Sequence, residues 1–233
     1  MKKAIVIIPA FNEASCISSV IKSVCAEAPG VDIVVVDDGS NDSTVEIARG
    51  EGVKVLCQKF NLGIGATMQT GYMYAHENGY DIAVQFDGDG QHPADQIAEL
   101  IEPVADGSAD VVVGSRFLGR GDYKPSKSRG AGIAIFSKVV SAIIREKVTD
   151  TTSGFRAVNR EVIDFYCKNY PDDYPEVEAL ILLHKKGFRI VEIPVTMVAR
   201  MGGSSSITPM RSAYYMVKVM LAIFVELLRR VEK

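Results

Sequence analysis

The chain has 233 residues, of which 47% are hydrophobic and 24% charged, so it is long enough to bury one substantial core with at most a small appendage. Its formal net charge is -3 and its basic residues form no stripe, which disfavours nucleic acid as a partner. Its 4 cysteines lack a CxxC spacing, which argues against a zinc site or a disulfide framework and indicates a reducing compartment. We therefore expect one main domain in the cytoplasm.

Short runs rich in valine and isoleucine predict strands at residues 4–8, 33–36, 53–56, 82–86, 111–113 and 190–193. The stretches between the earlier runs have helical spacing, as in Ile17, Val20, Ile21 and Val24. This alternation predicts a Rossmann-like α/β fold, with a mostly parallel central sheet covered by helices on both faces. After Thr149 the alternation fades. Ligands of such sheets bind beyond the carboxyl ends of the strands, so the residues that follow each strand are the candidates for chemistry.

Two adjacent carboxylates, Asp37 and Asp38, follow the predicted strand at residues 33–36. One interpretation is a polar turn in which Ser40 or Asp42 caps the next helix. The other is a nucleotide site, because ionised carboxylates accept hydrogen bonds from vicinal ribose hydroxyls and from a base edge. The local sequence leaves both interpretations open.

A second carboxylate pair, Asp87 and Asp89, follows a later predicted strand and is separated by Gly88. Carboxylates at i and i+2 of an extended turn can reach one hard cation, and the glycine lets backbone and ion approach closely. A calcium loop is disfavoured because Gln91 stands at the third ligand position. The pattern favours Mg²⁺ or Mn²⁺ with phosphate oxygens, and we expect the adjacent His92 to be structural rather than a ligand.

Five motifs closely resemble those of family 2 glycosyltransferases of the GT-A fold, at residues 7–13 (IIPAFNE), 36–40 (VDDGS), 61–65 (NLGIG), 87–93 (DGDGQHP) and 114–116 (GSR). A segment at residues 150–157 is similar to the branch of dolichyl- and polyprenyl-phosphate sugar synthases, and it contains Ser153, Gly154, Phe155 and Arg156. The resemblance covers roughly residues 4–207. It implies a GT-A catalytic domain that takes a sugar from a nucleotide-sugar donor.

The resemblance also implies a role for each matched residue. The nucleotide-sugar donor would be held by Pro9, Glu13, Asp37, Asp38, Gly65, Asp87 and Gly88. The metal, Mg²⁺ or Mn²⁺, would be bound by Asp87, Asp89 and Gln91. The catalytic residues would be Asp89, Arg116, Arg129, Arg200 and Glu178.

Arginines supply the predicted contacts to phosphate, because a planar guanidinium pairs with two oxygens at once. Arg116 and Arg129, with Ser137, match positions that meet the acceptor phosphate in the synthase branch. Arg200 matches the arginine of a loop of form RxxGxS that closes on the phosphates. A solvated surface charge is the alternative for Arg116 and Arg129. The chain departs from many polyprenyl-phosphate synthases at Ser206, where they carry a lysine.

Two acidic residues, Glu176 and Glu178, lie where many relatives have an acid at the head of a helix under the acceptor site. Carboxylates at i and i+2 face different sides of a helix, so at most one of them can point into the cleft. A hydroxyl acceptor would need such a group as a general base. An acceptor phosphate would not need one, because it is already ionised at neutral pH.

The segment at residues 210–231 mixes apolar residues and two tyrosines with four cations. It is too interrupted by charge to cross a bilayer and predicts an amphipathic helix at the membrane interface. Docking on the core, on a second copy or on a small integral membrane protein is the alternative. We expect a GT-A catalytic domain at residues 1–207 and this helix at residues 208–233, with the protein peripheral on the inner face of the cell membrane.

The leading hypothesis is inverting transfer of a sugar to a polyprenyl phosphate, dolichyl or undecaprenyl, for cell-surface glycan synthesis. The donor would be a UDP-, GDP- or dTDP-linked sugar. One alternative is transfer to a glycan hydroxyl, with Glu176 or Glu178 as the base. Another is a protein that binds nucleotide sugars without turnover, which the intact pair Asp87 and Asp89 disfavours.

Overall fold

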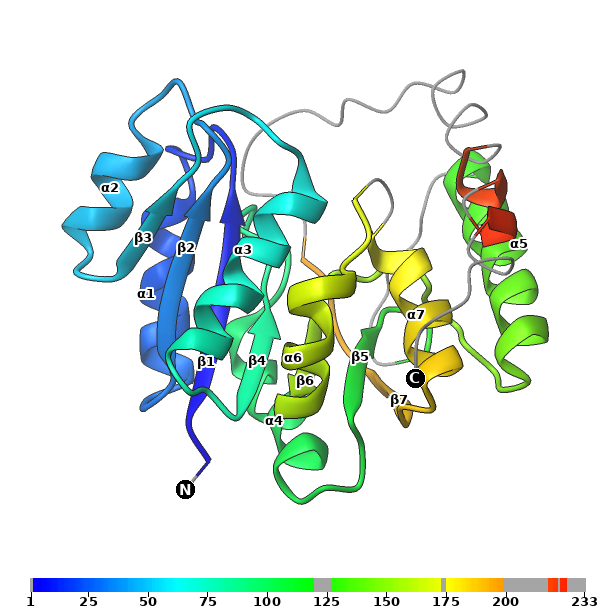
Figure 1. Ribbon diagram of the computed structural model, residues 1–233. Coiled ribbons are helices and arrows are strands. Elements are labelled where there is room, and N and C mark those ends of the chain that lie inside the picture. The colour runs from blue at the N-terminus through cyan, green and yellow to red at the C-terminus, as the bar shows by residue number, and fades with distance from the viewer. Residues whose placement is uncertain (1, 120–126, 173–174, 199–217, 222, 226–233) are drawn as a thin grey trace.

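A seven-stranded mixed sheet forms the centre of the molecule, in the order β3-β2-β1-β4-β6-β5-β7 (Figure 1). The computed structural model describes residues 2–119, 127–172, 175–198, 218–221 and 223–225. The strands are β1 (Ala4–Ala10), β2 (Asp32–Asp37), β3 (Lys54–Cys57), β4 (Ile82–Gln85), β5 (Val111–Ser115), β6 (Arg156–Asn159) and β7 (Ile190–Pro194). Each of the six predicted strands is present, and the predicted α/β class is confirmed.

Both faces of the sheet are buried, which explains why the strands are continuous apolar runs rather than alternating ones. In β1, Ile5 and Ile7 enter one hydrophobic cluster while Val6 and Ile8 enter a second cluster on the opposite face. Successive side chains of a strand point to opposite faces, so a strand covered on both sides must be apolar at every position.

Helices supply the two covering layers. The cluster around Val6 is closed by α1 (Ile17–Glu27), α2 (Thr44–Gly50) and α4 (Ile97–Ala105). The cluster around Ile5 is closed by α3 (Ile64–Glu77), α5 (Lys127–Ile144), α6 (Arg160–Asn169) and α7 (Pro175–Lys186). A short 3₁₀ helix, η1 (Ala94–Gln96), precedes α4. In α1 the predicted apolar stripe is the buried one, at Ile17, Val20, Ile21 and Val24.

One strand, β6, was not predicted from the sequence. It runs antiparallel to both of its neighbours, β4 and β5, whereas the other strand pairs are parallel. In this register Arg156 pairs with Gln85. Because β6 is reversed, its amino end lies at the same edge of the sheet as the carboxyl ends of the other strands. The turn before β6 therefore belongs to the edge where ligands bind.

The described part of the C-terminal segment, residues 218–221 and 223–225, packs on the α5 side of the molecule (Figure 1). Val219 and Ile223 are 0% and 2% exposed and join the cluster that contains Phe136 of α5. The predicted domain boundary at residue 207 stays a prediction. Within the part of the chain that is described, no helix is both long and apolar enough to cross a bilayer.

Candidate active site

The carboxyl ends of β1, β2 and β4 meet at one edge of the sheet because these strands are parallel neighbours. A cavity of about 370 Å³ lies at this edge. It is lined by Pro9, Ala10, Phe11, Glu13, Asp38, Asn61, Gly63, Ile64, Thr67, Asp87, Gly88 and Asp89. The fold thus brings together six of the predicted site residues, namely Pro9, Glu13, Asp38, Asp87, Gly88 and Asp89.

Glu13 is fixed between β1 and α1 by contacts of its main chain. Its N–H donates to Thr44 Oγ1 at 2.8 Å, and its carbonyl oxygen accepts from the N–H groups of Cys16 and Ile17. The Cys16 thiol lies 3.0 Å from Glu13 Oε2 and 3.2 Å from the carbonyl oxygen of Gly88. Burial, and next the hydrogen bond to Glu13, raises the pKa of Cys16 to about 12. The neutral thiol can therefore donate its hydrogen to either Glu13 Oε2 or the carbonyl oxygen of Gly88.

The adjacent carboxylates Asp37 and Asp38 have different surroundings. Asp37 is 2% exposed, and its Oδ2 accepts from the main-chain N–H groups at positions 39–40, as expected of the predicted polar turn. Asp38 lines the cavity, and its oxygens accept from the N–H groups of Leu62 at 2.7 Å and Gly63 at 3.0 Å. Asp38 thereby ties β2 to the glycine-rich loop before α3, while contact of Asp37 with a nucleotide stays a prediction.

The glycine-rich loop contains one glycine that serves close packing. A Cβ atom on Gly65 would lie 2.3 Å from the main-chain oxygen of Asp172 and 2.5 Å from that of Pro171, so a larger residue would push this segment away from α3. Gly63, which has φ 91°, lines the cavity instead. The predicted contact of Gly65 with the donor stays a prediction.

Asp87 and Asp89 both face the cavity from the loop after β4. The Asp87 side chain is 36% exposed, and its Oδ2 lies 3.5 Å from Nε2 of His92. Asp89 Oδ1 accepts from the N–H of Gln91 at 3.0 Å, which holds the turn. The His92 ring is buried and stacks 4.9 Å from the ring of Phe155. His92 thus packs in the interior and lies beside Asp87, and the expectation that it does not bind the metal itself stays a prediction.

The charge of the cavity favours a hard cation. Glu13, Asp38, Asp87 and Asp89 line it, and the lining residues within the described ranges include no lysine or arginine. A diphosphate would therefore meet charge of its own sign unless a cation lay between them. No group of three His, Cys, Asp or Glu side chains forms a ready metal cluster in the described part of the chain. Mg²⁺ or Mn²⁺ would have to take the remaining ligands from Gln91, water or the donor phosphates.

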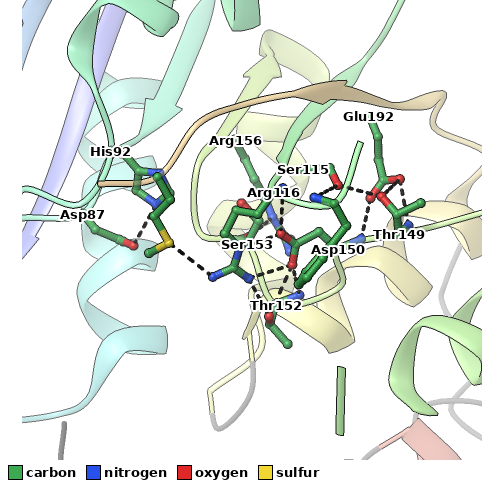
Figure 2. A network of polar contacts seen from close by, with 12 residues as sticks. Asp87, His92, Ser115, Arg116, Thr149, Asp150, Thr152, Ser153, Arg156 and Glu192 are labelled. Atoms are coloured by element: carbon green, nitrogen blue, oxygen red, sulfur yellow. Dashed lines mark hydrogen bonds and ion pairs between the residues drawn. The ribbon is translucent and has the colours of Figure 1, made fainter. Parts of the chain in front are cut away.

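Arg116, which follows β5, is buried in an ion pair (Figure 2). Its Nε donates to Asp150 Oδ2 at 2.6 Å and its Nη2 to Asp150 Oδ1 at 2.7 Å, so two of the three guanidinium nitrogens pair with one carboxylate. Nη2 also donates to Thr152 Oγ1 at 2.8 Å. At 5% exposed, Arg116 is not a solvated surface charge, and that alternative is wrong. Its contact with an acceptor phosphate stays a prediction.

Glu192 of β7 fixes the segment that carries Asp150. Its carboxylate accepts from the N–H and hydroxyl of Thr149 and from the N–H of Asp150, each at 2.8 Å. Ser115 Oγ lies 2.6 Å from Thr149 Oγ1 and extends this network to β5 (Figure 2). Arg116 is therefore held by a chain of contacts that begins in the edge strand of the sheet.

The segment that leaves β7 crosses the predicted metal loop. The N–H of Val198 donates to the carbonyl oxygen of Gln91 at 2.9 Å, and the N–H of Thr196 donates to Gln96 Oε1 at 2.9 Å. Between them, the Met197 sulfur lies 3.9 Å from an Nη atom of Arg116. The base of the predicted RxxGxS loop is thus attached to the loop that carries the predicted metal ligands.

The structure describes only part of the set of remaining predicted catalytic residues, which are Arg129, Arg200 and Glu178. Arg129 lies in the first turn of α5, and its side chain is outside the described set, as is the whole of Arg200. Glu176 and Glu178 are half-buried in the first turn of α7. Burial raises the pKa of Glu176, while the positive charge of Arg156 opposes that rise.

Three residues that organise the site, Asp150, Arg156 and Glu192, were assigned no role from the sequence. Each acts through a partner far away in the chain, such as Arg116 for Asp150 and Thr149 for Glu192. One signal was available: a charged residue beside a short apolar run, as at Arg156 at the start of β6, is costly to bury unless it has a specific partner.

The comparisons with known proteins agree with this geometry. The model of glycosyl transferase family 2 matches residues 5–166, more than half of the chain. The chain therefore belongs to glycosyl transferase family 2, and the predicted resemblance is confirmed. Its seven-stranded sheet with a candidate donor cavity at the carboxyl edge is that of a glycosyltransferase of the GT-A fold.

Several relatives are similar over most of their length. The UDP-N-acetylglucosamine–dolichyl-phosphate N-acetylglucosaminyltransferase of Methanococcus voltae is 32% identical over 216 residues, covering 82% of this chain and 84% of that one. The polyprenol monophosphomannose synthase of Mycolicibacterium smegmatis is 28% identical, with 89% and 82% covered. The undecaprenyl-phosphate mannosyltransferase of Micrococcus luteus is 29% identical, with 88% of each chain covered.

Solved structures establish the fold. The glucosyl-3-phosphoglycerate synthase of Mycobacterium tuberculosis in complex with UDP has a TM-score of 0.75 at 21% identity, covering 99% of this chain and 82% of that one. The same enzyme with Mn²⁺, UDP and phosphoglyceric acid has a TM-score of 0.73 at 22% identity, with 95% and 78% covered. At such identities the likeness supports the GT-A fold and carries no conclusion about substrate.

Proposed function

We propose that this chain transfers a sugar from a nucleotide-sugar donor to a polyprenyl phosphate, with inversion at the anomeric carbon. The observation that carries the proposal is the cavity at the carboxyl edge, which Asp38, Asp87 and Asp89 line together. The names of the relatives, which act on dolichyl, polyprenol and undecaprenyl phosphates, support the acceptor class.

For this reaction the protein has to position the donor and the acceptor and to neutralise the charge of the leaving diphosphate. An oxygen of the acceptor phosphate attacks the anomeric carbon, and the bond from that carbon to the nucleoside diphosphate breaks with its electron pair on the leaving oxygen. Asp87, Asp89 and Gln91 would hold Mg²⁺ or Mn²⁺, which when bound neutralises the leaving diphosphate. Glu13 and Asp38 would orient the nucleoside part through its hydroxyls. The acceptor phosphate is ionised at neutral pH and needs no general base.

Arginines would recognise the two phosphate groups. Arg129 and Arg200 would supply guanidinium groups to acceptor and donor phosphates, as their matched positions imply. Arg116 would contribute through Nη1, which lies 3.9 Å from the Met197 sulfur. Because Asp150 neutralises most of its charge, we assign Arg116 the smaller electrostatic share of the three.

A glycan hydroxyl is the second candidate acceptor, and one observation favours it. Burial raises the pKa of Glu176 at the head of α7, which is the shift expected of a carboxyl group that takes up a proton. The two acceptors differ in which residue matters. For a phosphate acceptor, Arg129→Ala should reduce kcat/KM far more than Glu178→Gln or Glu176→Gln, and for a hydroxyl acceptor the order should be reversed.

The protein would work at a membrane surface, on the cytoplasmic side. Leu221, Phe224 and Val225 are 61%, 58% and 56% exposed while Val219 and Ile223 anchor the same segment to the core. This arrangement supports an apolar face that lies in the head-group region without crossing the bilayer. A small integral membrane protein or a second copy of the chain would be the alternative partner of this face.

The proposal is tested by incubating the protein and Mn²⁺ with radiolabelled UDP-, GDP- and dTDP-sugars and a mixture of dolichyl and undecaprenyl phosphates. Label should enter the organic phase with one donor and be released by mild acid, as expected of a lipid-phosphate sugar. Label that enters only a water-soluble or acid-stable glycan product would support the hydroxyl acceptor instead.

A further inference from the structure

Arg156 is a buried cation at the functional edge of the sheet. It is the first residue of β6, pairs in register with Gln85 of β4, and is 2% exposed. A buried guanidinium is costly unless its N–H groups find acceptors. Within the described residues no carboxylate forms an ion pair with it. Its hydrogen-bond acceptors include main-chain carbonyl groups of two other segments.

The two carbonyl groups belong to the turn before β6 and to the first turn of α7. Its Nε donates to the carbonyl oxygen of Ser153 at 2.8 Å, in the turn before β6. Its Nη2 donates to the carbonyl oxygen of Glu176 at 2.6 Å, in the first turn of α7. A guanidinium presents its donors in a rigid plane, so the two contacts fix the distance and the angle between the turn and the helix.

The turn that Arg156 holds passes beside a predicted metal ligand. A Cβ atom on Gly154 would lie 3.0 Å from Asp87 Oδ1 and 3.0 Å from Gln85 Nε2, so a side chain at this position would crowd the Asp87 carboxylate. Gln85 is itself held by the hydroxyl of Tyr170 at 3.3 Å. A displacement of the turn would therefore change the space in which Asp87 sits.

The helix that Arg156 holds carries the acidic residues on the acceptor side. Glu176 and Glu178 both belong to the first turn of α7. The positive charge of Arg156 also acts on this turn. Burial raises the pKa of Glu176, and the charge of Arg156 opposes that rise. One buried side chain thus touches both the turn behind Asp87 and the head of α7.

We propose that Arg156 is a positioning residue for sugar transfer. It fixes the position of the donor-side carboxylate Asp87 relative to the acceptor-side helix α7. The proposal rests on the proposed function for its kinetic consequence. Its structural consequence, the placement of Asp87, does not depend on which acceptor is used. Binding of Mn²⁺ therefore provides a readout that is separate from activity.

The test compares Arg156→Lys and Arg156→Met with the control Arg160→Met. Arg160 is a half-exposed arginine on α6 that contacts Asp164. We expect Arg156→Lys to remain folded but to lower kcat by roughly tenfold or more, because a lysine lacks the fork that holds both carbonyls and small displacements are costly in transfer. With Mn²⁺ at a saturating concentration, the KM values for donor and acceptor should change less than kcat. Arg160→Met should match the wild type.

Mn²⁺ affinity is measured by electron paramagnetic resonance with UDP and with GDP present in turn. Arg156→Lys should weaken Mn²⁺ binding, and so should Gly154→Ala, which adds a methyl group against Asp87 while leaving Arg156 in place. Gly154→Ala keeps the test decisive if both Arg156 variants fail to fold. Wild-type Mn²⁺ affinity in Gly154→Ala, or wild-type kcat and Mn²⁺ affinity in a folded Arg156→Lys, would overturn the proposal. Absence of lipid transfer by the wild type would overturn only the proposed function.

Discussion

Arg116 donates to both carboxylate oxygens of Asp150, from Nε at 2.6 Å and from Nη2 at 2.7 Å. The pair is almost completely buried, with side chains 4% and 0% exposed. Two residues 34 positions apart in the chain thus form one buried ion pair. Breaking this pair should therefore lower the free energy of unfolding more than breaking an ion pair of the surface does.

Asp150→Ala should lower the free energy of unfolding by about 3–5 kcal/mol, because it leaves a buried guanidinium without its counter-charge. The matched control is Arg189→Ala, which breaks an ion pair with Asp110 whose arginine is 56% exposed. Solvent screening should make its cost much smaller than that of Asp150→Ala. Urea denaturation followed by circular dichroism measures both, and equal costs would contradict the assigned role of the buried pair.

Asp89→Ala should abolish transfer and leave the fold intact, because Asp89 faces the cavity and its loss removes a predicted metal ligand without opening the core. The control is Asp95→Ala, an exposed aspartate in η1. Activity is measured with Mn²⁺, with Mg²⁺ and after treatment with EDTA. Full activity in EDTA would rule out the metal requirement.

Cys16 should resist alkylation in the native protein. Its pKa is raised to about 12 by burial and by the Glu13 carboxylate, so the reactive thiolate is scarce at pH 8. Cys25 and Cys57 are exposed and should be the residues that iodoacetamide labels. Mass spectrometry of the native and the urea-unfolded protein measures this. Rapid labelling of Cys16 in the native protein would contradict the buried contact with Glu13.

The same shift predicts a loss of stability in base. The folded state favours the neutral Cys16 thiol, since its pKa lies above the ordinary value of 9.0. The contribution of this thiol is therefore complete below pH 9 and is lost as the pH rises from about 9 to 12. Cys16→Ala should flatten this part of the profile of unfolding free energy against pH. An unchanged profile would contradict the raised pKa of Cys16.

Leu221 and Phe224 should mediate binding to anionic vesicles. Removal of the whole segment from residue 210 would be a poor test, because Val219 and Ile223 belong to the core. A double substitution, Leu221→Glu with Phe224→Glu, should reduce sedimentation with phosphatidylglycerol vesicles at low salt. The control is Met73→Glu, an exposed position of α3.

Binding of the intact protein should also weaken with salt, because the screening length falls from about 10 Å at 0.1 M to about 3 Å at 1 M. If the intact protein stays in the supernatant at low salt, the exposed apolar face is better explained as a surface for a partner protein or a second copy.

Much of the fold was predictable because its signals are local. The apolar runs that became β1, β2 and β4 are buried on both faces, and the carboxylates after β2 and β4 follow from the chain order of a parallel sheet. The resemblance of the motif at Asp87 and Asp89 then pointed to the edge where the cavity lies.

What escaped prediction depends on contacts between distant segments. The strand β6 is only 4 residues long and runs against its neighbours, so no periodic signal marks it. The pairing of Arg116 with Asp150 is a tertiary contact, and Gly65 is required by the main chain at Asp172 rather than by a visible turn. The interior position of Val219 could not be distinguished from an interfacial one, because an amphipathic stripe fits both.

The acceptor is tested most directly by offering the wild-type protein, with Mn²⁺ and its donor sugar, a matched pair of lipids: a polyprenyl phosphate and the polyprenol of the same chain length. The pair differs only in the phosphate that the proposed mechanism uses as the nucleophile. We predict that label enters the polyprenyl phosphate, is released by mild acid, and leaves the polyprenol unlabelled. Equal labelling of the two lipids, or an acid-stable product, would contradict transfer to a lipid phosphate.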